Sequence, residues 1–137
     1  MLASGGTDLT LRTGNITTTG ATSTGIDAAN QTGNIAITSG NISATGLGLR
    51  AITSSTGSNT IVVGNVVSGD RGISATGGTV SVTAGNVSTS TNGGTTPGGI
   101  GVLALGLTGN VAVNTGAIST VNGAGIFARA EIGRAHV

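Results

Sequence analysis

Two short patterns alternate along most of the chain, and their recurrence constrains the fold more than any other feature of the sequence. The first pattern reads aliphatic-x-aliphatic-x-x-Gly-Asn-aliphatic, and its glycines fall at positions 14, 40, 64, 85 and 116. The second pattern reads Gly-aliphatic-x-Ala, and its copies begin at Gly25, Gly48, Gly72, Gly101 and Gly125. Because the two patterns alternate five times, the chain repeats one structural unit.

The repeat has the dimensions of one turn of a coil. Successive glycines of the first pattern are on average about 25 residues apart, whereas a propeller blade needs about 40 to 45 residues. Apolar residues alternate within each pattern with the period of two that is typical of strands. The shorter period suits one turn of a parallel β-helix, which contacts only its neighbours. We therefore predict an all-β fold, a parallel β-helix of about five turns over residues 1–130.

Composition leaves two other folds open. Gly, Thr, Ser and Asn make up more than half of the chain, as in many disordered segments. However, only 7% of the residues are charged and 36% are hydrophobic, mostly small or β-branched residues that favour strands. The Gly-Asn pairs could also make the turns of an antiparallel meander. Disorder and a meander therefore remain as alternatives to the coil.

Stacking of successive turns at about 4.8 Å would align like positions in columns. The inward columns would be the aliphatic residues and alanines of the second pattern: Ile26, Leu49, Ile73, Val102 and Ile126, and Ala28, Ala51, Ala75, Ala104 and Ala128. These small side chains predict a narrow interior without room for aromatic rings. The column between them would face outward: Asp27, Arg50, Ser74, Leu103 and Phe127. We expect Asp27 and Arg50 to form an exposed ion pair that contributes at most about 1 kcal/mol.

The Gly-Asn pairs are expected at a corner of the coil. Asparagines on successive turns could form a hydrogen-bonded ladder there: Asn15, Asn41, Asn65 and Asn86. Glycine and asparagine also tolerate the left-handed backbone that tight corners can need. Two copies of the first pattern depart from the rule, because Asn59 stands at an aliphatic place and Ala117 replaces asparagine. The longest interval contains residues 88–99, whose turn chemistry predicts a loop.

The last seven residues, EIGRAHV at positions 131–137, differ abruptly in composition from the rest. They contain the single histidine and the single glutamate of the chain. They also resemble the translated read-through of a sequencing adapter, so we treat them as a non-native tail. On this interpretation residues 1–130 are a fragment of a longer protein. A genuine polar tail is the alternative.

Several classes of function are disfavoured by composition. The net charge is +1 and there is one aromatic residue, whereas nucleic-acid binding needs clustered basic residues and stacking rings. The absence of cysteine excludes disulfides and cysteine-based metal sites. No apolar run is long enough to cross a bilayer, and the first ten residues do not read as a signal peptide. We expect no nucleic-acid partner and no membrane insertion by this segment.

No catalytic or metal site is predicted. The carboxylates outside the tail, Asp8, Asp27 and Asp70, occupy three different places in the repeat. They do not form the carboxylate pair of a glycosidase or the oxygen cluster that calcium prefers, and no histidine is present outside the tail. We therefore expect no catalytic, cofactor-binding or metal-binding residues and no cofactor.

A threonine-rich surface for ice or carbohydrate is an alternative function. It would use the residues that follow the Gly-Asn-aliphatic triplets, but its row of hydroxyls is interrupted at Val67 and Val121: Thr17/Thr19, Ser43/Thr45, Val67/Gly69, Ser88/Ser90 and Ser119/Val121. A further alternative is part of a β-helical polysaccharide-degrading enzyme whose active site lies elsewhere.

The alternating Gly-Asn-(Ile/Val)-(Ser/Thr) and Gly-Ile-x-Ala motifs resemble the passenger-domain repeats of bacterial autotransporters and related surface adhesins. The segment at residues 14–28, GNITTTGATSTGIDA, has this style of repeat, and the resemblance covers residues 7–130. It implies a right-handed β-helical stalk, exported by type V secretion and secreted or displayed at the surface of a Gram-negative cell. The implied role is a non-catalytic structural segment that serves adhesion. Its partners would be an unknown surface receptor or glycan and the adjacent turns of the full-length protein.

Overall fold

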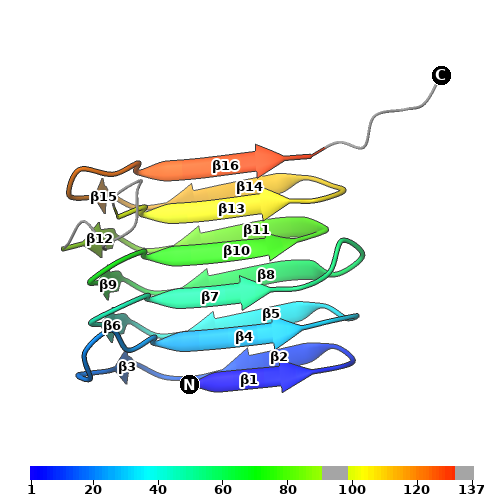
Figure 1. Ribbon diagram of the computed structural model, residues 1–137, viewed down its shortest axis with the longest axis horizontal. Coiled ribbons are helices and arrows are strands. Elements are labelled where there is room, and N and C mark those ends of the chain that lie inside the picture. The colour runs from blue at the N-terminus through cyan, green and yellow to red at the C-terminus, as the bar shows by residue number, and fades with distance from the viewer. Residues whose placement is uncertain (91–98, 132–137) are drawn as a thin grey trace.

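The computed structural model describes residues 1–90 and 99–131. Every regular element in these residues is a β-strand, and the strands form three parallel sheets that wrap into one coil (Figure 1). The chain is a parallel β-solenoid of about five turns. The predicted fold is confirmed, and the antiparallel meander is excluded because all strand pairs between successive turns are parallel.

Each turn contributes one strand to each of three sheets, here called sheets A, B and C. Sheet A contains β1 (Leu2–Gly5), β4 (Ile26–Asn30), β7 (Leu49–Ile52), β10 (Ile73–Gly77), β13 (Val102–Gly106) and β16 (Ile126–Ala130). Sheet B contains β2 (Leu9–Arg12), β5 (Ile35–Ser39), β8 (Ser58–Val63), β11 (Thr79–Ala84) and β14 (Val111–Thr115). Sheet C contains β3 (Ile16–Thr17), β6 (Ile42–Ala44), β9 (Val66–Ser68), β12 (Val87–Thr89) and β15 (Ile118–Ser119).

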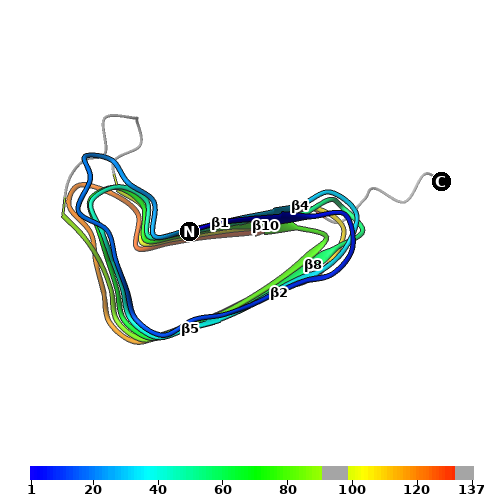
Figure 2. The same ribbon diagram turned by 90° about the horizontal axis from the view of Figure 1, so that it is seen from below.

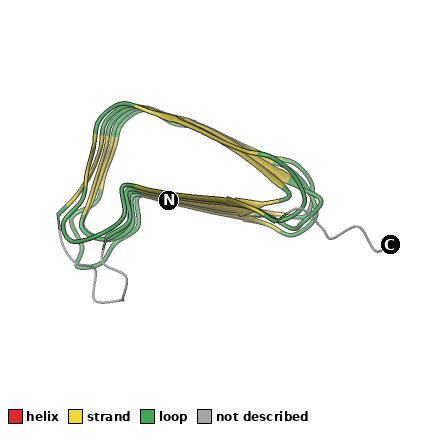
Figure 3. Ribbon diagram, turned by 90° about the horizontal axis from the view of Figure 1, so that it is seen from above, coloured by secondary structure: helices red, strands yellow, loops and turns green. Residues whose placement is uncertain are grey.

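The coil is right-handed. As the chain rises from β1 to β16 in Figure 1, the near strands of sheet A run to the right and the far strands of sheet B run to the left. Right-handed connections are the rule between parallel strands of one sheet, because strand twist favours them. Seen along the axis, sheets A and B are the two long sides and converge at one corner, while sheet C closes the wide end (Figures 2 and 3).

The predicted columns are confirmed by the register of the strands, although Ser74 of the outward column is buried. Ile26, Leu49, Ile73, Val102 and Ile126 pair in succession along sheet A, and so do the five alanines two positions later. The central members of both columns are fully buried in the interior of the coil. Sheets B and C complete the core with Ile35, Ile37, Ile42, Ile61, Val66, Val80, Val82 and Val87. As predicted, the described residues place no ring in the interior, and Phe127 lies on the outer face of sheet A.

Burial decreases toward both ends of the coil. Val102 is 0% exposed, whereas Ile126, which occupies the same column one turn later, is 47% exposed. Inward residues of the first and last turns, such as Leu9, Leu11, Val111 and Val113, are half-buried and pack against the core from one side. Each turn of a solenoid is covered by its neighbours, so the two end turns leave apolar surface open.

The first four glycines of the second pattern are required by close approach between turns. A Cβ atom at Gly25 would lie 2.5 Å from the Gly48 carbonyl oxygen and 2.6 Å from a methyl of Ile42. Gly48, Gly72 and Gly101 face the same obstruction by the glycine of the next turn and an aliphatic side chain of sheet C. Side chains of sheet C therefore fill the space beside these glycines, which keeps the wide end of the coil tightly packed.

The expectation of left-handed glycines at the corners is wrong for the part of the chain that the structure describes. None of these glycines has a positive φ, whereas Thr22 and Asn122 have φ angles of 60° and 53°. Apart from these two residues, the described corners are turned with negative φ angles, and the constraint that selects glycine at positions such as Gly25 and Gly40 is the space between stacked turns.

The predicted loop at residues 88–99 lies mostly outside the described residues, as does the tail beyond Glu131. The flanking strands keep their register, because Thr89 pairs with Ser68 and Val102 pairs with Ile73. The additional length of this turn therefore falls between Ser90 and Gly99.

Candidate functional site

The predicted asparagine ladder is present at the corner between sheets B and C. The Asn41 N–H donates to Asn15 Oδ1 at 2.8 Å, and the Asn65 N–H donates to Asn41 Oδ1 at 2.8 Å. The ladder continues through Asn86 and ends at the Ala117 N–H, which donates to Asn86 Oδ1 at 2.9 Å. Each asparagine thus binds the backbone of the next turn, which satisfies a donor that the corner would otherwise leave to solvent.

The glycine before each ladder residue makes room for the asparagine one turn below. A Cβ atom at Gly40, Gly64 or Gly85 would come within 3.0 Å of that asparagine's Oδ1. No described atom comes within 4 Å of such a Cβ at Gly14, which belongs to the first turn. The Gly-Asn pair therefore acts between turns, with the glycine of one turn receiving the side chain of the previous turn.

Replacing Gly64 with alanine is expected to lower the free energy of unfolding by about 1 to 3 kcal/mol. The added methyl group would displace Asn41 Oδ1 and leave the Asn65 N–H without its acceptor. The matched control is Gly14→Ala, which is expected to change stability by less than about 1 kcal/mol because the site is open. Urea unfolding of both variants measures the difference, and equal losses would contradict the proposed fit.

A second and shorter ladder, which the sequence did not predict, joins the first three turns at the corner between sheets A and B. The Asn34 N–H donates to Asp8 Oδ1 at 2.8 Å, and Asn34 Oδ1 accepts from the Ser58 N–H at 2.9 Å. The signal in the sequence is the polar residue just before the first aliphatic residue of each copy: Asp8, Asn34, Ser58, Thr79 and Asn110. These residues share one column, as the pairing of sheet B requires.

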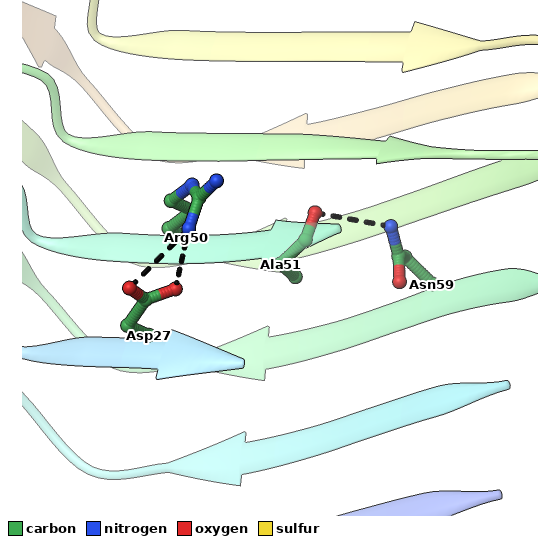
Figure 4. A network of polar contacts seen from close by, with 4 residues as sticks. All are labelled: Asp27, Arg50, Ala51 and Asn59. Atoms are coloured by element: carbon green, nitrogen blue, oxygen red, sulfur yellow. Dashed lines mark hydrogen bonds and ion pairs between the residues drawn. The ribbon is translucent and has the colours of Figure 1, made fainter. Parts of the chain in front are cut away.

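Asn59 is a buried polar residue in an otherwise aliphatic column. It lies between Ile35 and Val80 in sheet B and is 1% exposed. Its Nδ2 donates to the Ala51 carbonyl at 3.2 Å and to the Thr76 carbonyl at 2.8 Å (Figure 4 shows the first contact). Its Oδ1 has no hydrogen-bond partner among the described residues. The amide therefore links sheet B to two successive strands of sheet A, and its role is in packing.

The three predicted carboxylates lie at separate places. Asp8 is at the corner ladder, Asp27 is on the outer face of sheet A, and Asp70 is in the loop before β10. The predicted ion pair is confirmed, with Arg50 Nη1 at 3.0 and 3.3 Å from the two carboxylate oxygens of Asp27 (Figure 4). Because the two side chains are 42% and 30% exposed, the pair contributes at most about 1 kcal/mol.

A shallow groove of about 330 Å³ runs along the outer side of sheet C. Its lining includes Asn15, Asn41 and Asn65 of the ladder together with Thr17, Ser43 and Val67. The row considered for ice binding is in register here, because Thr17, Ser43, Val67, Ser88 and Ser119 pair in succession. Val67 is exposed and interrupts the hydroxyl groups, as the sequence indicated.

Within residues 1–90 and 99–131, no three His, Cys, Asp or Glu side chains are grouped so that they could hold a metal ion. The same residues contain no helix that could span a membrane. Comparison of the sequence with protein families, curated proteins and solved structures finds no match. The repetitive stacking itself, with its two ladders and aliphatic core, is therefore the feature from which a function is argued.

Proposed function

We propose that this chain is a non-catalytic stalk segment of a secreted or surface-displayed bacterial passenger protein that serves adhesion. Its task would be to extend and present other parts of that protein. The observation that carries the proposal is the in-register parallel stacking of successive turns in all three sheets. With stacking of this kind, the length of the coil is proportional to its number of turns.

The contacts between turns suit a load-bearing spacer. Strand hydrogen bonds, the asparagine ladder and the aliphatic columns all connect one turn to the next. The six strands of sheet A are separated by five intervals, which gives a rise of about 24 Å at about 4.8 Å for each interval. Because three sheets with different orientations share this rise, we expect the coil to resist bending as well as stretching.

The bacterial surface assignment is supported by the resemblance of the repeats to those of autotransporter passengers. The motif that carries the resemblance, Gly-Asn-(Ile/Val), has a defined task in this chain, since it joins each turn to the next. A secreted stalk has to fold from an unfolded, exported chain. Local stacking, in which each turn forms on the previous one, is compatible with that requirement.

The stalk is tested first by its length. Thr10 and Ala112 occupy one outward column of sheet B, four turns apart. Spin labels on Thr10→Cys and Ala112→Cys are expected to give a narrow distance distribution, with the labelled backbone positions about 19 Å apart. A broad distribution centred at about 55 Å, as expected of a flexible chain of this separation, would contradict a rigid stalk. The chain has no native cysteine to interfere with the labelling.

The presenting role is tested on cells. The chain is fused between an outer-membrane anchor and a short adhesive peptide, and attachment to a surface coated with the peptide's ligand is measured under flow. We expect stronger attachment than with a Gly/Ser linker of about 20 residues, whose average end-to-end distance matches the rise of about 24 Å. The rigid segment keeps the peptide at that distance, whereas the flexible linker also bends back toward the cell. Equal attachment by both fusions would contradict the proposal.

A further inference from the structure

One inward column of sheet C contains hydroxyl groups, although the core around it is aliphatic. Ala44, Ser68 and Thr89 occupy this column as the last residues of β6, β9 and β12, which lie on successive turns (Figure 1). Thr18 extends the column one turn below Ala44, because its N–H donates to the Ser43 carbonyl as the register requires. The column therefore consists of three hydroxyl groups interrupted by one methyl group.

The three hydroxyl groups of this column have no hydrogen-bond partner among the described residues. Ser68 and Thr89 are 1% and 2% exposed, and neither Ser68 Oγ nor Thr89 Oγ1 is hydrogen-bonded. The buried Thr18 Oγ1 is in the same situation. Buried side-chain oxygens are usually bound by protein or by ordered water, so their concentration in one column indicates a shared partner.

The strand spacing explains why neighbouring hydroxyl groups do not bind each other. Like positions on adjacent strands lie about 4.8 Å apart, whereas a hydrogen bond between two hydroxyl oxygens needs about 2.7 to 2.8 Å. A single water molecule between Ser68 Oγ and Thr89 Oγ1 could lie at this shorter distance from both. Each hydroxyl group can donate or accept, and a buried water needs at least two polar partners.

We propose that the coil binds an ordered internal water molecule between Ser68 and Thr89, held by the hydroxyl groups of two successive turns. The ligand is water because the column contains no charged residue and offers fewer oxygens than a hard cation prefers. Aliphatic columns such as Ile73 and Val102 provide no polar partner, so they hold no water. The water would join β9 to β12 in addition to the strand hydrogen bonds. The inference does not depend on the adhesive role.

The first test is the sign of the stability change in Thr89→Val, which keeps the shape of the side chain and removes its hydroxyl group. If water bridges the two turns, the change leaves the water and Ser68 with one partner fewer. The ratio of folded to unfolded chain is then expected to fall about fivefold or more in urea unfolding. If the hydroxyl group has no partner, its removal raises this ratio. An unchanged or raised ratio overturns the proposal.

The matched control is Thr83→Val, which makes the same chemical change at an exposed, outward position of β11. This variant is expected to unfold at nearly the same urea concentration as the unmodified chain. An equal loss at Thr83 would show that the substitution itself, and not a bound water, lowers stability, and this result would also overturn the proposal.

A double-mutant cycle tests whether Ser68 and Thr89 share one partner. Because both hydroxyl groups hold the same water, the double variant Ser68→Ala/Thr89→Val is expected to lose less than the sum of the two single losses. Additive losses would mean that the two hydroxyl groups act independently, contrary to the proposal. Circular dichroism checks the fold of each variant, and Ser68→Cys replaces Ser68→Ala if the latter unfolds.

A crystal structure of the full chain, at a resolution that shows ordered solvent, tests the site directly. We expect a water within hydrogen-bond distance of both Ser68 Oγ and Thr89 Oγ1, and we expect it to be lost in Thr89→Val. A structure of the unmodified chain in which the two hydroxyl groups bind protein atoms and no water would overturn the proposal.

Discussion

Replacing Asn59 with aspartate is expected to lower the free energy of unfolding by about 3 kcal/mol or more at pH 7. The substitution keeps the size of the side chain but removes the two donors that bind the Ala51 and Thr76 carbonyl groups. It would also place a negative charge against these two oxygens in a site that is 1% exposed. Chemical denaturation of the variant and the unmodified chain at pH 7 measures the loss.

The penalty at Asn59→Asp should depend on pH in a defined direction. Burial raises the pKa of a carboxyl group above its unfolded value of about 3.9. The loss of unfolding free energy relative to the unmodified chain is therefore largest at pH values above the raised pKa. The loss decreases as the pH falls toward 4, because the protonated carboxyl group can again donate a hydrogen bond. A deficit that does not change with pH would contradict this explanation.

The matched control is Asn34→Asp, because Asn34 uses its Oδ1 as an acceptor at an exposed corner. A carboxylate already fills this role one turn below, at Asp8. The change at Asn34 is expected to stay within about 1 kcal/mol. Similar losses at both positions would mean that burial at Asn59 is not the cause.

Replacing Gly48 with alanine is expected to lower the free energy of unfolding by about 3 kcal/mol, the upper part of the range for overpacked sites. The new methyl group would overlap the Gly72 carbonyl oxygen of the next turn and lie 2.6 Å from a methyl of Val66. Since one obstacle is backbone, the two turns would have to separate. Thermal and urea unfolding are the measurements.

The control is Gly125→Ala, at the same place in the last turn. There the nearest atom to the new Cβ is a methyl of Ile118 at 3.7 Å, an ordinary contact. We expect this variant to be as stable as the unmodified chain or more stable by up to about 1 kcal/mol, since alanine restricts the unfolded chain more than glycine does. A loss at Gly125 equal to that at Gly48 would show that conformational freedom, and not space, selects glycine here.

The columns of the coil could be predicted from sequence because strand pairing is periodic. Once the Gly-aliphatic-x-Ala copies are aligned, Ile26 has to meet Leu49 and Asp27 has to meet Arg50, and both contacts are present. The asparagine ladder followed from the same alignment. In each case the prediction needed only the order of residues along one strand and the rule that successive turns stack.

Contacts between different sheets were less predictable. The hydrogen bonds of Asn59 reach carbonyl groups of sheet A whose positions depend on how the corner is turned. The close approach at Gly25 was not predicted for a related reason, since its neighbour Ile42 belongs to sheet C. Outward residues such as Thr17 and Ser43 could be placed in a row, but a row of hydroxyl groups does not specify a ligand. The function is therefore a proposal, whereas the fold is shown by the structure.

The interval between Ser90 and Gly99 has a practical consequence. Turns of unequal length stack in the same coil, since the ladder bonds on either side of Asn86 span different numbers of residues. The strands on both sides of the interval also keep their partners. Foreign peptides grafted at this corner should therefore project from the side of the rod without changing its pitch. The scaffold would then offer a regularly spaced series of attachment points, one for each turn that receives a graft.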